Sequence, residues 1–311
     1  MTAGPVGPES ARRIATIYGA RGTAWVERLP MTLRELADTW QLTHIGEPFA
    51  GVRTAFVAPV TDRGGRALVL KVSSDLDSAR FEHEALAHWN GSGAVRVLGF
   101  EPNLGAILEE RLTPGSSLKD ADLNGPEAVD VFVDVVTALR ASESVAAGLP
   151  AFSYWLKPLD LPQSPAPSPS LELHIRQARA VTETLLGIPS KQRVLHGDLH
   201  HSNILRGHGG WLAVDPKPVV GPEEAEAAAF LRNLRCQVIG LADPLEVLTS
   251  RTLAIATRLD FDPVRVAGWA FVMGVIAAVW AQEDREGEGE VEKWLRCAAV
   301  LRQTYDRVRT G

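Results

Sequence analysis

The sequence predicts an α+β fold in two parts, a small β-rich N-terminal lobe and a larger α-helical C-terminal lobe. Alternating apolar patterns gather between residues 50 and 111, which is typical of a small sheet. From Glu223 onward the pattern is almost entirely helical. The length of 311 residues also suggests two domains. We therefore expect an N-terminal lobe at 1–110, a connection at 111–116 and a C-terminal lobe at 117–311.

Composition and charge exclude several classes of function. The chain is 45% hydrophobic and has a net charge of −6, so it has no general attraction to nucleic acid or to an acidic membrane surface. Two cysteines, Cys236 and Cys297, are too few for a disulfide framework and favour a cytoplasmic location. The N-terminus lacks the features of a signal peptide. The longest apolar run, Gly268 to Ala281, is shorter than the about 20 residues of a bilayer span, and predicts a buried helix.

The predicted N-terminal lobe begins with helical spacing over residues 9–45. Pro30 interrupts this run, and Thr32 with Glu35 forms a capping-box pattern for a second helix. Two strands joined by a turn follow, in the segments TAFVAPV and ALVLKV. A helix is predicted in SARFEHEALAHWN, and two further strands in AVRVLGFEPNLGAILEER.

In the predicted C-terminal lobe, residues 118–142 and 171–187 have helical spacing. The Pro- and Ser-rich segment KPLDLPQSPAPSPS between them is typical of a loop. The segment ILR-GHGG-WLAVD predicts a strand, a tight turn and a strand. Such a hairpin returns the chain on itself, so Asp215 is expected close to Asn203.

The residues around this hairpin suggest phosphoryl transfer. Asn203 follows Asp198 by five residues, and Asp215 ends the second strand. Magnesium prefers hard oxygen ligands, so Asn203 and Asp215 are the candidate Mg²⁺ ligands. Asp198 then remains to accept a proton from a substrate hydroxyl. Enzymes of the protein-kinase type divide the same tasks among an Asp, an Asn five residues later and a following metal-binding Asp.

A zinc site is the alternative interpretation of this region, because it is rich in histidine: His196, His200, His201 and His208. The spacing does not match H-E-x-x-H and no cysteine is near, which disfavours zinc. We expect His196 to be a buried residue that holds the loop by hydrogen bonds, and His208 to lie in solvent at the turn.

A kinase-type site also needs a strand lysine that binds the nucleotide phosphates and a helix glutamate that orients it. Lys71 lies in an otherwise apolar strand, where a charge needs a partner. The following helix offers Glu82 and Glu84 on different faces; we predict Glu84 as the partner, with Glu82 in reserve. The main chain from Glu109 to Leu112, with Glu110 and Leu112 as the nucleotide-binding residues, is expected to meet the adenine edge.

These motifs resemble the aminoglycoside phosphotransferase family, and within it the streptomycin 6-kinase and hydroxyurea-resistance kinase group. The likeness covers nearly the whole chain and includes VLKV, WNGSGAVRVLG, LEERLTPGSSL, VLHGDLHHSNIL, LAVDPKPVVG and VWAQED. The resemblance implies a protein-kinase-like fold, ATP and Mg²⁺ as cofactors, and phosphorylation of a hydroxyl of an aminoglycoside such as streptomycin. It also implies a role in antibiotic resistance or self-protection.

One segment departs from the group. Its members commonly continue with Gly-Asp-Pro and a further Asp, acids that the resemblance implies are structural and hold the catalytic loop. This chain has GPEEAE, with Pro222 in place of the first acid and Glu226 near the second. The departure supports the alternative of a catalytically impaired protein that binds a nucleotide or an antibiotic.

The acceptor is expected to be a small cationic molecule. The long segment that protein kinases carry after the metal-binding Asp is missing. Residues 281–292, AQEDREGEGEVE, hold six acids and one arginine, which would attract a cation or simply form a solvated loop. The resemblance favours Glu283 and Asp284 as substrate-binding residues, with Trp280 as a wall of the site. A kinase for another small cationic metabolite is a further alternative, and the oligomeric state is open.

Overall fold

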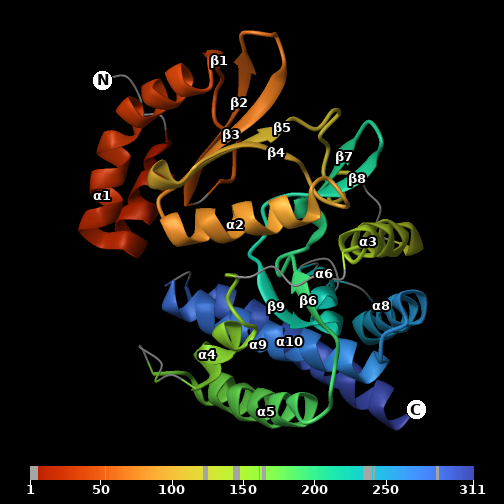
Figure 1. The fold of residues 1–311 in the computed structure, drawn as a ribbon. Helices are drawn as coiled ribbons and strands as arrows, with labels where there is room; N and C mark the ends of the chain where they lie inside the picture. The colour runs from red at the N-terminus through yellow and green to blue at the C-terminus, as the bar shows by residue number, and fades with distance from the viewer. Residues whose placement is uncertain are drawn as a thin grey trace. The chain divides into compact units, whose positions relative to one another are not determined.

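The structure is a computed structural model of the chain. It describes residues 6–52, 54–121, 125–142, 148–160, 162, 166–233, 240, 242–284 and 287–311; Cys236 and Glu286 lie outside these ranges. The chain divides into two compact units, residues 1–115 and 116–311, and each is described by itself (Figure 1). The division falls within the segment 111–116 that the sequence analysis assigns to the connection. The expected β-rich first unit and helical second unit are confirmed.

The N-terminal unit is built on a five-stranded antiparallel sheet in the order β1-β2-β3-β5-β4. The four strands predicted from alternating apolar residues are confirmed, and a fifth, β1, precedes them. Their bounds are β1 Leu42–Ile45, β2 Ala55–Asp62, β3 Ala67–Ser73, β4 Val97–Glu101 and β5 Ala106–Glu110.

Two helices pack on this sheet. Helix α1, Pro8–Thr39, contributes Leu29, Leu33 and Leu36 to a core with the side chains that alternate on one sheet face, among them Phe56 and Leu70. Helix α2, Leu76–Trp89, packs against β3, β4 and β5. Successive side chains of a strand point to opposite faces. Position 71 of β3 therefore faces away from the α1 core.

The start of the chain differs from its prediction. Residues 42–45 form β1, because pairing with β2 overrides their helical spacing. Pro30 lies inside α1, and the kink in that helix is at Gly19, whose φ of 58° is outside the helical range. Thr32 does not cap a new helix: its hydroxyl donates to the carbonyl of Arg28, one turn earlier.

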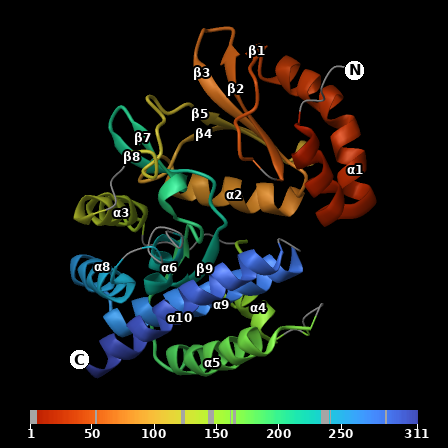
Figure 2. The ribbon, with the colours of Figure 1, turned by 180° about the vertical axis from the view of Figure 1, so that it is seen from behind.

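The C-terminal unit is mainly helical, with two short two-stranded sheets, β6–β9 and β7–β8. Helix α9 lies at its centre and packs against α5, α6 and α10, as Figures 1 and 2 show. By length and composition α9 could cross a membrane, but 89% of its most apolar window is buried in the unit, so it is the core helix expected there. The helices are α3 Pro126–Leu139, α4 Ser153–Asp160, α5 Pro169–Leu186, α6 Ala227–Arg232, α8 Pro244–Leu259, α9 Pro263–Glu283 and α10 Glu288–Thr310; the strands are β6 Gln192–Leu195, β7 Ile204–Gly207, β8 Gly210–Ala213 and β9 Val219–Pro222.

Helix α4 was not expected from the sequence. Its last residues, Lys157 to Asp160, belong to the Pro- and Ser-rich segment predicted as a loop. Pro158 lies inside the helix and is buried together with Leu156 and Leu159. Burial of these apolar side chains against α5 and α9 stabilises a helix that the local composition disfavours.

Candidate functional site

The predicted hairpin brings two candidate magnesium ligands together. Strands β7 and β8 pair in register, with Ile204 opposite Ala213. The next pair continues the ladder, since the N–H of Val214 donates to the carbonyl of Asn203 at 2.9 Å. Asp215 directly follows and has a left-handed backbone, with φ of 58°. Such conformations are strained for non-glycine residues and cluster at functional sites.

The chemistry of these ligands fits magnesium better than zinc. The side-chain N–H₂ of Asn203 donates to the carbonyl of Asp198 at 3.0 Å, so its amide oxygen is the atom suited to a cation. The ammonium of Lys217 lies 2.9 Å from the Asp215 carboxylate. One carboxylate and one amide oxygen suit an ion that also binds phosphate and water. Among the described residues, no group of three or more His, Cys, Asp or Glu side chains could hold a metal ion.

His196 anchors the loop that carries Asp198. The imidazole is fully buried, its Nε2 lies 3.0 Å from the carbonyl of Val214, and its Nδ1 accepts from the N–H of Asp198 at 3.3 Å. These contacts require the neutral tautomer protonated on Nε2. Burial lowers the pKa of His196 to about 3, which keeps it neutral. The predicted loop-holding role of His196 is confirmed.

Glu226 holds the same loop from the other side. Its carboxylate accepts from the N–H groups of His196 at 2.7 Å and of Gly197 at 3.1 Å. Burial raises the pKa of Glu226 to about 7, although the two N–H groups act in the opposite direction. The Glu226 side chain therefore binds the catalytic loop in the way the resemblance implies for the family's acid. Glu226 of the GPEEAE segment thus makes the loop contacts expected of the second acid, while Pro222 still stands in place of the first, and the alternative of an impaired protein stays open.

Asp198 lies between two basic side chains. The guanidinium of Arg232, at the end of α6, is 3.3 Å from Oδ1, and Nε2 of His200 is 3.7 Å from Oδ2. Burial lowers the pKa of His200, while the charge of Asp198 partly opposes this. Arg232 is only 5% exposed and keeps its charge, so it orients one carboxylate oxygen. The Asp198 side chain itself is partly exposed.

The predicted acceptor residues occupy one face at the C-terminal end of α9. Trp280, Glu283 and Asp284 are spaced i, i+3 and i+4, which places them as neighbours on a helix. Burial and the charge of Asp284 raise the pKa of Glu283. The ring of Trp280 packs edge-to-face with that of Trp155 from α4, at 5.6 Å between centroids. Sequence reasoning missed both Trp155 and Arg232, because each reaches the site through packing of distant helices.

In the N-terminal unit, Lys71 pairs with Glu82 and not with Glu84. The ammonium of Lys71 is 2.7 Å from the Glu82 carboxylate, and both residues are buried. Glu84 instead pairs with Arg80, one turn earlier on α2, and is partly exposed. The prediction of Glu84 is therefore wrong. The signal for Glu82 was present, since it shares the buried face of α2 with Ala79 and Leu86.

One of the main-chain groups expected to bind adenine already has a partner within the N-terminal unit. The N–H of Glu110 donates to the carbonyl of Arg96 at 3.0 Å, so it is already used within the unit. The Glu110 carboxylate also accepts from the N–H of Arg96. Leu112 lies in the irregular segment that follows β5. Adenine binding by the main chain at Glu110 and Leu112 stays a prediction.

His201 is a buried histidine beside the catalytic loop. Its ring stacks on Phe230 at 4.1 Å, and within the part of the chain that the structure describes neither ring nitrogen has a hydrogen-bond partner. Burial lowers the pKa of His201 to about 3, with the charge of Arg251 acting in the same direction. His201 therefore serves as a neutral spacer in the folded state.

We expect His201→Leu to make the protein less sensitive to acid. A folded-state pKa below the unfolded value means that the unfolded chain binds the extra proton, so the parent loses stability as pH falls below about 6.5. Between pH 7 and pH 5 the variant should gain about 2 kcal/mol of unfolding free energy relative to the parent. Urea unfolding across this range measures the difference. His208→Leu, at the exposed turn, is the control, and parallel pH curves for His201→Leu and parent would contradict the assignment.

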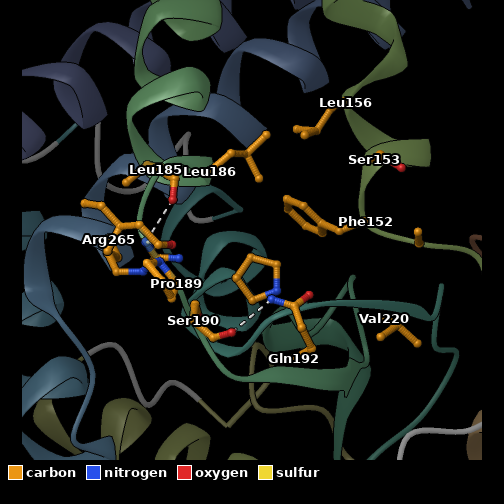
Figure 3. A pocket seen from close by; sticks show the side chains of 13 residues that line it. Phe152, Ser153, Leu156, Leu185, Leu186, Pro189, Ser190, Gln192, Val220 and Arg265 are labelled. Carbon is orange, nitrogen blue, oxygen red and sulfur yellow. Dashed lines mark hydrogen bonds between the residues drawn. The ribbon is translucent and has the colours of Figure 1, made fainter.

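A separate surface groove lies elsewhere in the C-terminal unit. Its volume is about 370 Å³, and Figure 3 shows it between Phe152, Leu156, Leu185 and Val220, with Arg265 at one side. The Arg265 guanidinium already donates to Glu224 and to the carbonyl of Leu185. None of the predicted site residues lines this groove. It therefore takes no part in the site described above.

Comparison with known proteins identifies a family and several relatives of this chain. The profile of the family described as aminoglycoside/hydroxyurea antibiotic resistance kinase matches residues 39–285. A streptomycin 6-kinase of Streptomyces glaucescens is 29% identical over 283 residues, covering 88% of this chain and 90% of the relative. A hydroxyurea phosphotransferase of Kitasatospora aureofaciens is 30% identical over 283 residues, covering 86% and 77%.

A solved structure shows the fold. It is an aminoglycoside phosphotransferase, APH(4)-Ia, in a ternary complex with AMP-PNP and hygromycin B. It is 16% identical to this chain, covers 86% of this chain and 97% of its own, and has a TM-score of 0.64. The fold is therefore of the protein-kinase-like type shared by these phosphotransferases.

Proposed function

Because the chain belongs to the aminoglycoside/hydroxyurea antibiotic resistance kinase family, we propose that it transfers the γ-phosphoryl group of ATP to a hydroxyl of a cationic aminoglycoside such as streptomycin. The family members are phosphotransferases with hydroxyl acceptors, and this chain is a kinase of that kind. The observation that carries the proposal is the arrangement of Asp198, Asn203 and Asp215 on one hairpin and its loop. The setting that we propose is the cytoplasm.

Each of these residues has a distinct task in the proposed reaction. The acceptor oxygen forms a bond to the γ-phosphorus while the bond to the ADP oxygen breaks, and the hydroxyl proton passes to the Asp198 carboxylate. Arg232 holds Oδ1 of that carboxylate, which leaves Oδ2 to meet the hydroxyl. Asn203 and Asp215 would hold Mg²⁺, which neutralises charge on the phosphates.

The second part of the proposal concerns binding of ATP by residues of the N-terminal unit. Lys71, oriented by Glu82, would bind the phosphates, as strand lysines do in kinases. The main chain at Glu110 and Leu112 would meet the adenine. In support, the solved aminoglycoside phosphotransferase binds AMP-PNP, an analogue of ATP.

The acceptor side is assigned to the end of α9. Glu283 and Asp284 place two acids on the face that also carries Trp280, which suits guanidinium or ammonium groups. Trp155 contacts both Trp280 on this face and Gly197, the residue before Asp198. These two contacts support acceptor binding by Glu283 and Asp284 over the alternative that the two acids are only solvated. Another small cationic metabolite is the second candidate acceptor, and turnover with a panel of acceptors separates the two.

We expect the double variant Glu283→Gln with Asp284→Asn to raise the acceptor KM by roughly 5–30-fold and to leave the ATP KM unchanged. This corresponds to about 1 kcal/mol for each exposed charge contact. Because salt screens such contacts, raising the ionic strength should raise the acceptor KM of the parent more than that of the variant. Steady-state kinetics with streptomycin at several salt concentrations measures both effects.

The matched control is Glu288→Gln with Glu292→Gln, which removes the same charge from exposed positions of α10. It should leave the acceptor KM near the parent value. Equal salt dependence in the parent and the α9 double variant would show that Glu283 and Asp284 do not contact the acceptor. If the parent phosphorylates no aminoglycoside at all, the proposed function itself is wrong.

A further inference from the structure

We propose that Trp155 determines acceptor specificity, by forming with Trp280 an aromatic wall that favours a cationic, ring-bearing acceptor over a small neutral one. This inference rests on the proposed function and names its substrate class more closely. The family includes kinases of both kinds of acceptor, since relatives of this chain include a streptomycin 6-kinase and a hydroxyurea phosphotransferase. Membership of the family therefore does not fix the acceptor, which must be determined by residues of this chain.

The first argument is the position of Trp155 against the catalytic loop. Its indole lies directly over Gly197, because a Cβ at that glycine would be 3.2 Å from Cζ2 of Trp155. Gly197 has φ of 77°, and the same Cβ would lie 2.4 Å from the carbonyl oxygen of Lys217. The backbone at Gly197 is thus held between Lys217 and the indole. The indole therefore packs on the residue that directly precedes the candidate base, Asp198.

The second argument is the exposure of the two rings. Trp155 and Trp280 are both only partly buried, although Trp280 lies in the last turn of α9, whose other aromatic residues, Trp269 and Phe271, are fully buried. An edge-to-face pair engages one ring face and one ring edge, so other ring faces stay available for a ligand. Aromatic side chains left partly exposed near a candidate base are typical of a binding site.

The third argument is the charge next to the wall. The acids Glu283 and Asp284 lie on the same helix face as Trp280. Aromatic faces and carboxylates both attract cations, so together they select guanidinium and ammonium groups. A sugar or cyclitol ring also packs on an indole through its C–H groups. Hydroxyurea is small and uncharged, so it gains little from either contact.

The test compares two acceptors in Trp155→Ala and Trp155→Phe. With streptomycin, Trp155→Ala should raise the acceptor KM roughly 10-fold. The ATP KM is measured in the same variants. A rise of the ATP KM in Trp155→Ala as large as the rise of the streptomycin KM would show that the indole only supports the loop, and would overturn the inference. Trp155→Phe should recover most of the streptomycin affinity, because it keeps an aromatic face. For hydroxyurea the KM should change less than 3-fold in both variants, so the preference for streptomycin falls in Trp155→Ala.

Tyr154→Ala is the control, since this neighbouring residue of α4 is 57% exposed and its ring contacts Lys157. It should leave both acceptor KM values unchanged. An unchanged streptomycin KM in Trp155→Ala overturns the inference, and so does an equal rise for both acceptors or a failure of Trp155→Phe to recover affinity. If the parent protein phosphorylates neither acceptor, the proposed function is wrong. The assay of the parent alone shows this, so it is not confused with failure of the Trp155 inference.

Discussion

Replacing Asp198 by asparagine should lower turnover by roughly 10²–10⁴-fold, the usual contribution of a positioned general base. The amide has nearly the shape of the carboxylate, so the loop contacts made by the backbone of Asp198 with His196, His200 and Asn203 should persist. Arg232 loses a charged partner, which should cost about 1 kcal/mol of unfolding free energy. The affinity for ATP should stay within a few-fold of the parent value.

The measurement is kcat with a saturating aminoglycoside, together with calorimetric titration of the nucleotide. Asp134→Asn is the matched control, because it makes the same chemical change at an exposed residue of α3 that is outside the loop. A kcat for Asp198→Asn within 10-fold of the parent would exclude Asp198 as the base. A loss of nucleotide affinity as large as the loss of kcat would show that the residue acts in binding.

The hairpin and its ligands could be predicted because their geometry is local. A tight turn between two short apolar strands leaves few possible registers, so the approach of Asp215 to Asn203 follows from their spacing in the sequence. The role of His196 was also accessible, because a histidine in an apolar loop needs neutral hydrogen-bond partners. These parts of the site depend on about twenty consecutive residues.

The missed parts depend on tertiary packing. Arg232 meets Asp198 across 34 residues of sequence, and Trp155 meets Trp280 through contact of α4 with α9. No local periodicity states which helices will touch. The role of Glu226 was obscured for a different reason: its side chain is one methylene longer than the family's Asp, yet it still reaches two N–H groups of the loop.

The prediction of Glu84 as the partner of Lys71 is wrong although both glutamates lie on the same predicted helix. The observed pair of Lys71 with Glu82 predicts the effect of removing it. Glu82→Gln should lower the affinity for ATP at least 10-fold and cost about 3–5 kcal/mol of unfolding free energy, because it leaves the buried Lys71 charge without its carboxylate. Glu84→Gln is the matched control on the same helix. It should change stability by less than about 0.5 kcal/mol, since its pair with Arg80 is partly exposed.

A third variant separates stability from binding. Replacing a buried ion pair by apolar residues of similar size is often neutral or stabilising, so Lys71→Met with Glu82→Leu should recover most of the unfolding free energy lost in Glu82→Gln. It should not recover ATP binding, because the proposed phosphate ligand is gone. Urea unfolding and nucleotide titration on the three variants test both statements. Recovery of ATP affinity in the double variant would show that Lys71 is only a structural partner of Glu82, and equal effects of the two glutamine variants would return Glu84 to the site.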